Sequence, residues 1–312
     1  MSPRLLGYML EAIPAHDYWL DLGARMHPAL RTRSSLRLLS ALARRQMSSD
    51  GLVTTNLGIA QSLKIQVRPA HLHARFGKPS LYDGERGALE LACALAPQSD
   101  AFLDIGAHIG FFTWCVRTLA SPTIPIYFFE PDPDLFKLLQ ANLEKNHLDA
   151  VVGVPAAIGA RDGTARFYRN LSDSFSGSLG NGFQLQHQHE VVPVDVEVRS
   201  FASIGRQYGF ERATVKVDVE NAEWDFLDGA AGAFERIAYL IIEVLRPAHE
   251  RRFVPELMKH SGLKAYYIND YQLEHSEDGS FNYRSPEYNW LFCRETPGEL
   301  AERVRGTRLR VA

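Results

Sequence analysis

From residue 101 onward, short apolar runs alternate with amphipathic segments, and this alternation limits most strongly how the chain can fold. The apolar runs are typical of strands, and the segments between them are typical of helices. The predicted strands are "AFLDIG", "IPIYFFEP", "VVGVPAAIG", 214–220, "IAYLIIEVL", "KAYYIND" and "NWLFC", and the predicted helices cover 110–120, 133–147, a segment from 222, and 249–261. Strands joined by helical crossovers form a mostly parallel sheet with helices on both faces. We therefore expect a Rossmann-like α/β fold with a seven-stranded sheet.

The segments outside this alternation divide the chain into three parts. Residues 1–80 are expected to form a helical extension that includes a short β-hairpin over 51–80. Its helix at 31–47 has leucines on one face and arginines on the other, which suits docking on the core, on a second subunit, or on an anionic or membrane surface. A homodimer through these N-terminal helices is a hypothesis. The main domain is expected over 81–296, followed by a basic, exposed tail over 297–312.

Composition restricts the classes of partner. The chain has 312 residues, of which 46% are hydrophobic, so it can bury a substantial core. Its net charge of −3 gives no global field for a nucleic acid. The three cysteines are far apart and lack metal-type spacing, which favours a reducing compartment. Charged residues interrupt the apolar runs of the N-terminus, and no run is long enough to span a bilayer. We expect a cytoplasmic protein with no transmembrane segment and no nucleic-acid partner.

The stretch "FLDIGAHIGFF" places Gly106 and Gly110 at a strand-to-helix turn, where glycine lets the backbone approach a ligand. A dinucleotide fingerprint needs glycine at 106, 108 and 111, but this chain has His108 and Phe111. The D-x-G-x-x-x-G spacing suits S-adenosylmethionine instead. Asp104 would take the ammonium of its methionine moiety, and the loop amides would take its carboxylate.

Glu130 supports a nucleoside cofactor. It ends the second predicted strand, where an acid can accept hydrogen bonds from both hydroxyls of a ribose. A plain tight turn would explain Gly106 and Gly110 alone, but it does not explain Asp104 and Glu130 at two neighbouring strand ends.

Four blocks together resemble the FkbM-type S-adenosylmethionine-dependent methyltransferase family: "FLDIGAHIGFFT", "FFEPDPDLFKLLQANLEKN", "VKVDVENAEWDFLDGA" and "YLIIEVLRP". The similarity runs from about Tyr82 to Phe292. It implies a Rossmann-like methyltransferase fold and S-adenosyl-L-methionine as cofactor. It also implies O-methylation of a hydroxyl on a sugar, a glycan, or a glycosylated or polyketide small molecule.

The resemblance also implies roles for residues at matching positions. Those implied for the cofactor are Glu85, Asp104, Gly106, Ala107, His108, Gly110, Glu130, Pro131 and Asp132 beside the adenine, and Ala157 and Ile158 in the adenine pocket. Those expected at the acceptor are Ser174 and Ser176 in a serine-rich loop, Asn289 before the last strand, and Lys216 and Glu243 near strand ends. Two positions depart from the family pattern: His108 stands where asparagine is usual, and Asn221 stands where glycine is usual.

In "VKVDVENAEWDFLDGA" the charged residues Lys216, Asp218 and Glu220 alternate with valines, so they would share one face of a strand. Ligands bind outside the carboxyl ends of the strands in an open parallel sheet, so Asp218 and Glu220 are expected at the rim of the site. Methyl transfer needs an aligned acceptor and a general base. The candidates for the base are Asp218 and Glu220, with His108 as a third. Lys216 would pair with Asp218 and keep it ionised.

No metal site is assigned from the sequence, although Asp218, Glu220 and Glu243 offer the oxygen ligands that suit Mg²⁺ or Ca²⁺. Three other functional classes compete with the enzyme. A catalytically silent module that binds a protein partner would accommodate His108 and Asn221. A nicotinamide enzyme lacks its glycines here, and a nucleic-acid methyltransferase would need a basic groove or a base-binding motif. The sequence does not identify the acceptor. Residues 1–80 and the polar segment 160–212 are expected to determine the specificity for it.

Overall fold

The computed structural model describes residues 52–55, 59, 62–68, 85–170, 177, 179, 191–244, 247–280 and 288–312. The predicted helix at 31–47 and the predicted acceptor residues Ser174 and Ser176 lie outside these ranges. The domain boundaries expected from the sequence therefore stay predictions.

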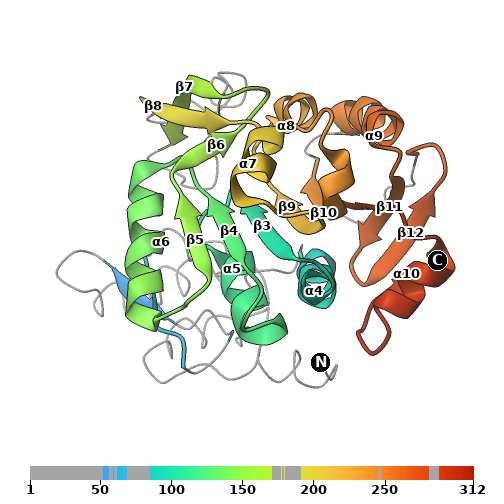
Figure 1. Cartoon of the computed structure of the whole chain (residues 1–312), viewed down its shortest axis with the longest axis horizontal. Helices are drawn as coiled ribbons and strands as arrows, with labels where there is room; N and C mark the ends of the chain where they lie inside the picture. Colours follow the sequence, from blue (N-terminus) through green and yellow to red (C-terminus); the bar gives the residue numbers. More distant parts are fainter. Residues whose placement is uncertain are drawn as a thin grey trace, which may run out of the picture.

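A nine-stranded sheet forms the centre of the described protein, in the order β14-β12-β11-β13-β10-β9-β3-β4-β5 (Figure 1). Its strands are β3 (Ala101–Ile105), β4 (Ile126–Phe129), β5 (Val151–Val154), β9 (Ala213–Val217), β10 (Ile237–Glu243), β11 (Lys264–Asn269), β12 (Gln272–Ser276), β13 (Asn289–Cys293) and β14 (Arg310–Val311). β5, β4, β3, β9 and β10 run parallel, and β13 is antiparallel to both of its neighbours. The predicted count of seven was too low because β12 and β14 extend one edge.

Helices cover both faces of this sheet, as predicted. One face carries α4 (Arg86–Leu95), α5 (Phe111–Cys115) and α6 (Pro133–Asn146), and the other carries α7 (Phe201–Tyr208), α8 (Glu223–Gly229) and α9 (Pro247–Ser261). Shorter helical turns are η4 (Ala96–Gln98), the π-helix η5 (Val116–Ala120) that continues α5, and η7 (Phe234–Arg236).

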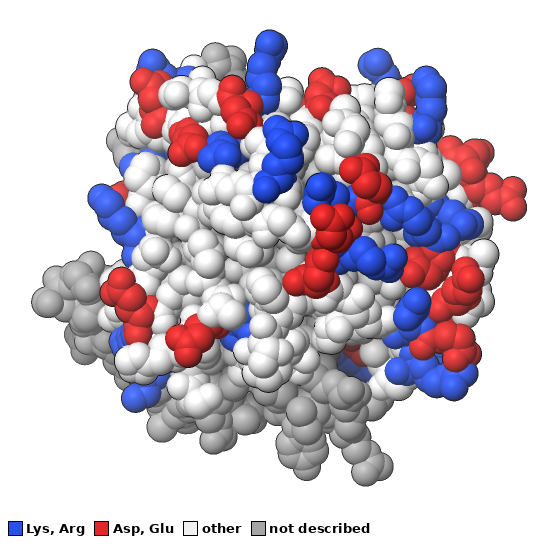
Figure 2. Space-filling model, viewed as in Figure 1, with Lys and Arg blue, Asp and Glu red and all other residues white. Residues whose placement is uncertain are grey.

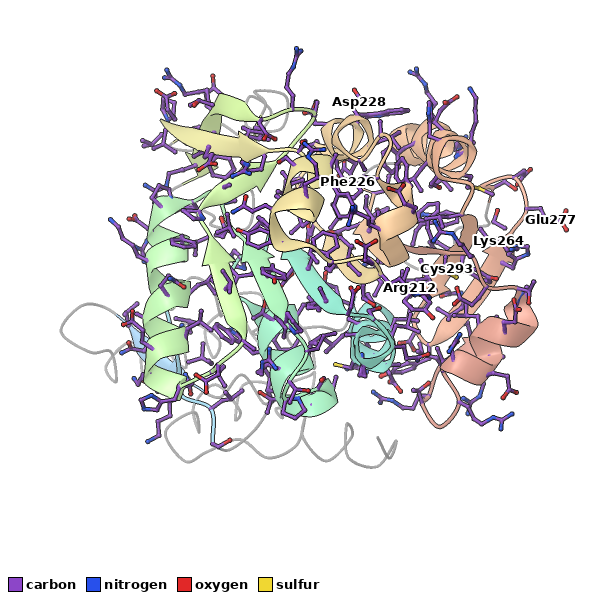
Figure 3. The ribbon with its side chains drawn as sticks, viewed as in Figure 1. Arg212, Phe226, Asp228, Lys264, Glu277 and Cys293 are labelled. Atoms are coloured by element: carbon purple, nitrogen blue, oxygen red, sulfur yellow. The ribbon has the colours of Figure 1, made fainter. Side chains whose placement is uncertain are left out.

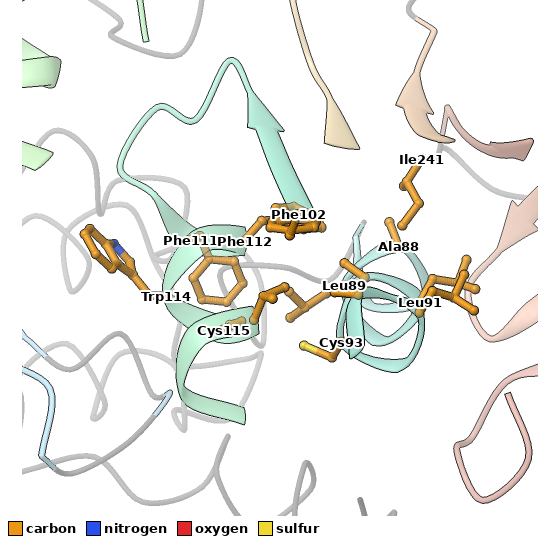
Figure 4. Packing of buried hydrophobic residues seen from close by; sticks show 14 of the residues in the cluster. Ala88, Leu89, Leu91, Cys93, Phe102, Phe111, Phe112, Trp114, Cys115 and Ile241 are labelled. Atoms are coloured by element: carbon orange, nitrogen blue, oxygen red, sulfur yellow. The ribbon is translucent and has the colours of Figure 1, made fainter. Parts of the chain in front are cut away.

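Alternation along the strands divides the core between these two faces. Phe102 packs with α4 and α5, whereas its neighbour Leu103 packs on the opposite side. Figure 4 shows Leu89 of α4 directed toward α5 and Ala88 directed toward Ile241 of β10. On the other face, Phe226 lies on the inner side of α8, while Asp228 points away from the sheet (Figure 3).

A second, three-stranded sheet occupies much of the segment predicted to be a polar excursion. It pairs β6 (Ala156–Ile158), β8 (Val191–Arg199) and β7 (Gly163–Asn170) in that order. The predicted strand "VVGVPAAIG" is therefore two strands in different sheets, which separate at Pro155. The pattern was hard to predict because the apolar cluster of this sheet has few buried members in the described part of the chain, namely Ala157, Phe167, Val196 and Val198.

Before α4, β1 (Val53–Thr55) and β2 (Ile65–Val67) form the predicted antiparallel pair. Asn142 of α6 accepts a hydrogen bond from Gln66 N at 2.7 Å and donates one to Gln66 O at 2.8 Å. Asn146 binds Lys64 in the same manner. One face of α6 therefore completes the hydrogen bonding of the edge of β2.

The C-terminal segment is not an exposed tail, contrary to the prediction. α10 (Pro297–Arg303) buries Leu300, and β14 pairs with β12. Arg308 donates from its main-chain N and its Nε to the buried carboxylate of Glu90, at 2.6 and 2.9 Å. The basic residues of this segment made it look exposed, but Val304 and Leu309 between them are buried.

Within the described ranges, no helix combines the length and the apolar character that a bilayer crossing requires. Figure 2 shows acidic and basic side chains interspersed over the visible face, with no broad area of positive charge among the coloured residues. That face offers no basic groove for a nucleic acid.

Candidate active site

The candidate site lies at the carboxyl ends of β3, β4, β9 and β10. Asp104 is the fourth residue of β3, Glu130 directly follows β4, Asp218 directly follows β9, and Glu243 ends β10. These four strands are parallel, so their carboxyl ends meet at one edge of the sheet.

The loop after β3 adopts left-handed backbone angles at Gly106 (φ 77°), His108 (φ 52°) and Gly110 (φ 76°). Gly106 N and Ala107 N both donate to Phe129 O, at 3.0 and 3.1 Å, and Gly110 N donates to Ala107 O at 2.7 Å. The loop is thus fixed on β4 by its own amides. These three amides are engaged within the fold, and the binding of the cofactor carboxylate by the loop amides stays a prediction.

Asp104 is buried, and one of its carboxylate oxygens is committed to the fold. Its Oδ2 accepts hydrogen bonds from Thr113 N at 3.0 Å and Thr113 Oγ1 at 2.7 Å. Its Oδ1 has no hydrogen-bond partner among the residues that the structure describes. Burial raises the pKa of Asp104 to about 6, against the opposing effects of Thr113 and Lys216. The chemistry of this free oxygen fits an ammonium group, as predicted for the methionine moiety of the cofactor.

Glu130 is also buried, and both oxygens of its carboxylate accept hydrogen bonds from the main chain. Oε2 accepts from His108 N and Oε1 accepts from Asp132 N, each at 2.8 Å. A carboxylate oxygen has two lone pairs, so each oxygen can accept one hydrogen bond more. Burial raises the pKa of Glu130 to about 8 despite these two bonds. The position and the remaining lone pairs fit the two hydroxyls of a ribose.

The other residues predicted around the adenine have mainly structural contacts. Asp132 caps α6 by accepting from Asp134 N and Leu135 N, and its Oδ2 accepts from Arg169 Nε at 2.7 Å. Pro131 is half-buried beside it. The side chains of Ala157 and Ile158 pack in hydrophobic clusters.

The fourth strand is shorter than predicted. β9 ends at Val217, and Glu220 (φ 47°) and Asn221 (φ 75°) form a left-handed turn. Glu220 therefore does not extend a strand face with Lys216, and it is not among the acids that converge at the strand ends. Asn221 adopts a left-handed conformation, which asparagine tolerates better than most residues.

Three carboxylates converge where the sequence predicted Asp218, Glu220 and Glu243. The group consists of Glu85, Asp218 and Glu243, each of which offers an oxygen within 4.8 Å of the others. Glu85 directly precedes α4, which packs on this face of the sheet. The family resemblance implied a cofactor role for Glu85, but it did not predict the contact with Asp218, which lies 133 positions later in the sequence.

Lys216 lies beneath this carboxylate group. Its side chain is 1% exposed, its Nζ lies 3.4 Å from Asp218 Oδ2, and the Nζ is 5.0 Å from the centre of the Phe112 ring. The predicted pairing of Lys216 with Asp218 is confirmed, but the side chain is too deeply buried for the predicted direct contact with an acceptor. It positions Asp218, which is 30% exposed.

The charges of this group are strongly coupled. Burial raises the pKa of Glu243 well above its usual range, and the nearby Asp218, which also shares a hydrogen bond with it, raises the pKa further. Burial opposes the charge of Lys216, but four surrounding carboxylates, Asp218 foremost, raise its pKa above the usual value. Burial lowers the pKa of His108 to about 4, against the attraction of Asp218. At neutral pH the site thus holds a lysine cation and a neutral histidine.

Asn289 adjoins this group from the next strand. It is the direct antiparallel partner of Glu243, so the two side chains lie on the same face of the sheet. Its side chain is 2% exposed, and its Oδ1 has no hydrogen-bond partner in the described part of the chain. The predicted acceptor residue is therefore buried beside the carboxylates.

Comparisons with known proteins identify the family of the chain. The model of the methyltransferase FkbM domain family matches residues 104–269. Hexuronic acid methyltransferase AglP from Haloferax volcanii is 24% identical over 162 residues, which cover 52% of this chain and 62% of AglP.

Solved structures of methyltransferases also align. An FkbM methyltransferase from Methylobacillus flagellatus aligns with a TM-score of 0.42 at 15% identity, over 87% of this chain and 60% of that one. A SAM-dependent methyltransferase from Agrobacterium tumefaciens aligns with a TM-score of 0.41 at 8% identity, over 80% and 72%. The family match alone spans more than half of the chain and includes Asp104, Glu130, Asp218 and Glu243. This chain belongs to the FkbM methyltransferase family.

Proposed function

We propose that the protein is an S-adenosylmethionine-dependent O-methyltransferase whose acceptor is a hydroxyl of a sugar, a glycan or a glycosylated small molecule. The observation that carries the proposal is the meeting of two buried acids, Asp104 and Glu130, with a solvent-reaching carboxylate, Asp218, at one edge of the sheet.

In this proposal, Asp104 and Glu130 hold the cofactor. Asp104 Oδ1 accepts from the ammonium of the methionine moiety, and the Glu130 carboxylate accepts from the two ribose hydroxyls. When bound, the cofactor supplies an activated methyl group on a sulfonium. The protein then has to align the acceptor oxygen in line with that methyl group and remove the hydroxyl proton.

Asp218 is the base in this scheme. It is 30% exposed, its neighbour Lys216 carries the positive charge that favours its ionised form, and its main-chain N donates to Ile105 O at 2.9 Å. His108 is a weaker candidate because burial lowers its pKa to about 4. Glu220 belongs to the turn after β9 and lies outside the converging group. The hydroxyl proton therefore passes to Asp218 as the oxygen takes the methyl group.

The named relative supports a sugar acceptor. AglP is described as a hexuronic acid methyltransferase, and it is 24% identical to this chain over 162 residues. A hexuronic acid has both hydroxyls and a carboxylate as possible methyl acceptors. These two groups differ in whether their methylation requires a general base. Methylation of a hydroxyl needs a base, whereas a carboxylate is already ionised and needs none.

The proposal is tested by incubating the protein with methyl-labelled S-adenosylmethionine and a panel of neutral glycosides, hexuronic acid glycosides and glycosylated polyketides. The expected product is a methyl ether that survives mild alkali, formed together with an equal amount of S-adenosylhomocysteine. An alkali-labile methyl ester would overturn the assignment to a hydroxyl. If no acceptor is methylated and the protein does not bind the cofactor, the proposal that it is a methyltransferase is overturned.

A further inference from the structure

We propose that Glu85, Asp218 and Glu243, together with the amide oxygen of Asn289, form a binding site for one divalent cation of the Mg²⁺, Mn²⁺ or Ca²⁺ type. The cation site does not depend on the proposed function. A role for the ion in holding acceptor oxygens beside Asp218 does rest on it.

The first observation is the convergence of three carboxylates from three separate elements. Glu85 precedes α4, Asp218 follows β9 and Glu243 ends β10, yet an oxygen of each lies within 4.8 Å of the other two. Oxygen ligands lie about 2.0 to 2.6 Å from Mg²⁺ or Ca²⁺, so two ligands of one ion are up to about 5 Å apart. The spacing therefore suits a single shared ion.

Asn289 provides an independent second observation. Its side chain is buried, and its Oδ1 is not hydrogen-bonded within the described ranges. Buried carbonyl oxygens are normally paired, so a partner is expected here. Because Asn289 and Glu243 are direct cross-strand partners, the amide projects from the same face of the sheet as the Glu243 carboxylate. An ion bound by the three acids would give this oxygen its partner.

The charge of the group also favours a dication. Lys216 lies 3.4 Å from Asp218 and offsets one of the three carboxylates. With all three carboxylates ionised, two negative charges remain, and a divalent ion neutralises both.

The ligand chemistry identifies the class of ion. The group offers only carboxylate and amide oxygens, which are the ligands that Mg²⁺, Mn²⁺ and Ca²⁺ prefer. His108, which interacts electrostatically with Asp218, is not among the residues that converge. The free cysteines Cys93, Cys115 and Cys293 are buried elsewhere in the core.

The test uses the full chain, freed of metal with a chelator, and Mn²⁺ as the probe. Calorimetry and the paramagnetic resonance of free Mn²⁺ should show one ion bound per chain. Mg²⁺ and Ca²⁺ should displace Mn²⁺.

Substitutions separate this site from adventitious binding. Glu85→Gln and Glu243→Gln should each weaken Mn²⁺ binding at least tenfold, and Asn289→Leu should weaken it severalfold. Glu235→Gln removes an exposed carboxylate of η7 and should have no effect. Circular dichroism establishes that each variant is folded.

Absence of saturable Mn²⁺ binding by the folded wild-type chain would overturn the inference, as would equal affinity in Glu85→Gln, Glu243→Gln and Glu235→Gln. The two proposals fail separately. Mn²⁺ binding without methyl transfer supports the cation site and counts against the proposed function. Methyl transfer that is insensitive to chelator, in a chain that binds no Mn²⁺, supports the proposed function and counts against the cation site.

Discussion

A Cβ atom added to Gly106 would lie 1.8 Å from the main-chain oxygen of Asp218. The loop that carries the cofactor residues is thus in direct backbone contact with the turn that carries the proposed base. The hydrogen bond from Asp218 N to Ile105 O, 2.9 Å long, reinforces this contact. The two halves of the site cannot separate without breaking the edge of the β3–β9 pair.

Gly106→Ala should therefore destabilise the protein more than an ordinary substitution of a left-handed glycine. The new methyl group meets backbone that cannot move aside, and the φ of 77° adds strain, so we expect a loss of about 3 kcal/mol or more in the free energy of unfolding. Gly209→Ala is the matched control, because Gly209 has φ 70° but open space around it. Its cost should be about 1 kcal/mol. Equal losses in denaturant unfolding would mean that the Gly106–Asp218 contact imposes no constraint.

The pH dependence of stability should show the burial of Glu130. Its pKa is about 8 in the folded chain and near 4.5 when unperturbed, so between these values the folded state binds more protons than the unfolded state. Stability conferred by this group is therefore lost as pH rises from about 5 to 8. Denaturant unfolding of the cofactor-free protein should show this fall relative to Glu130→Gln, which does not titrate. Parallel curves for the two proteins would contradict a raised pKa.

The same shift makes cofactor binding depend on pH. The ribose hydroxyls are donors and bind best to an ionised carboxylate, and Glu130 becomes ionised as pH approaches 8. The affinity for S-adenosylhomocysteine should therefore rise between pH 6 and 8, by up to about tenfold per pH unit. Calorimetric titration at several pH values measures this. In Glu130→Gln the rise between pH 7 and 8 should disappear, and only the rise that Asp104 contributes near its pKa of about 6 should remain.

Lys216 should oppose the binding of the divalent ion while it positions Asp218. Lys216→Met removes a positive charge next to the carboxylates, so Mn²⁺ should bind more tightly to this variant, whereas turnover should fall. Protonation of Glu243 also becomes more favourable in this variant. The electrostatic energy of a dication changes twice as much as that of a proton in the same potential, so ion binding gains more. Lys216→Arg retains the charge and should keep the wild-type affinity. Weaker Mn²⁺ binding by Lys216→Met would show that Lys216 supports the site instead of competing with it.

The β1–β2 pair should depend on Asn142. This buried side chain makes two hydrogen bonds with Gln66, and Asn142→Ala would leave both main-chain groups unpaired. We expect a loss of about 1 to 3 kcal/mol in the free energy of unfolding. Asn146→Ala removes a similar pair of bonds at an exposed position and should cost less. Hydrogen exchange at Gln66 N and Lys64 N locates the effect.

The sequence predicted the strand ends of the cofactor site well. Asp104 and Glu130 each follow an apolar run that is buried in the core, and such runs define strand ends with little dependence on distant contacts. The pairing of Lys216 with Asp218 was also predictable, because residues two apart on a strand share a face.

The end of β9 and the convergence of the acids were not predictable in the same way. Val219 continues the alternating pattern, but the left-handed angles of Glu220 and Asn221 stop the strand at Val217, and sequence alternation does not report backbone angles. Glu85 reaches Asp218 and Glu243 only because α4 packs across β9 and β10, which is a tertiary contact. Likewise, sequence alone does not show that the amides of Gly106, Ala107 and His108 donate to Phe129 O and Glu130.

The most direct test of the account compares S-adenosylhomocysteine binding to the wild-type chain, Glu130→Ala and Asp218→Asn by calorimetry. We predict micromolar binding to the wild type, at least a tenfold loss in Glu130→Ala, and unchanged affinity in Asp218→Asn, whose methyl transfer should fall about 100-fold or more. Absence of binding to the folded wild type, or an equal loss of affinity in both variants, would contradict the division of the site into a cofactor half and a catalytic half.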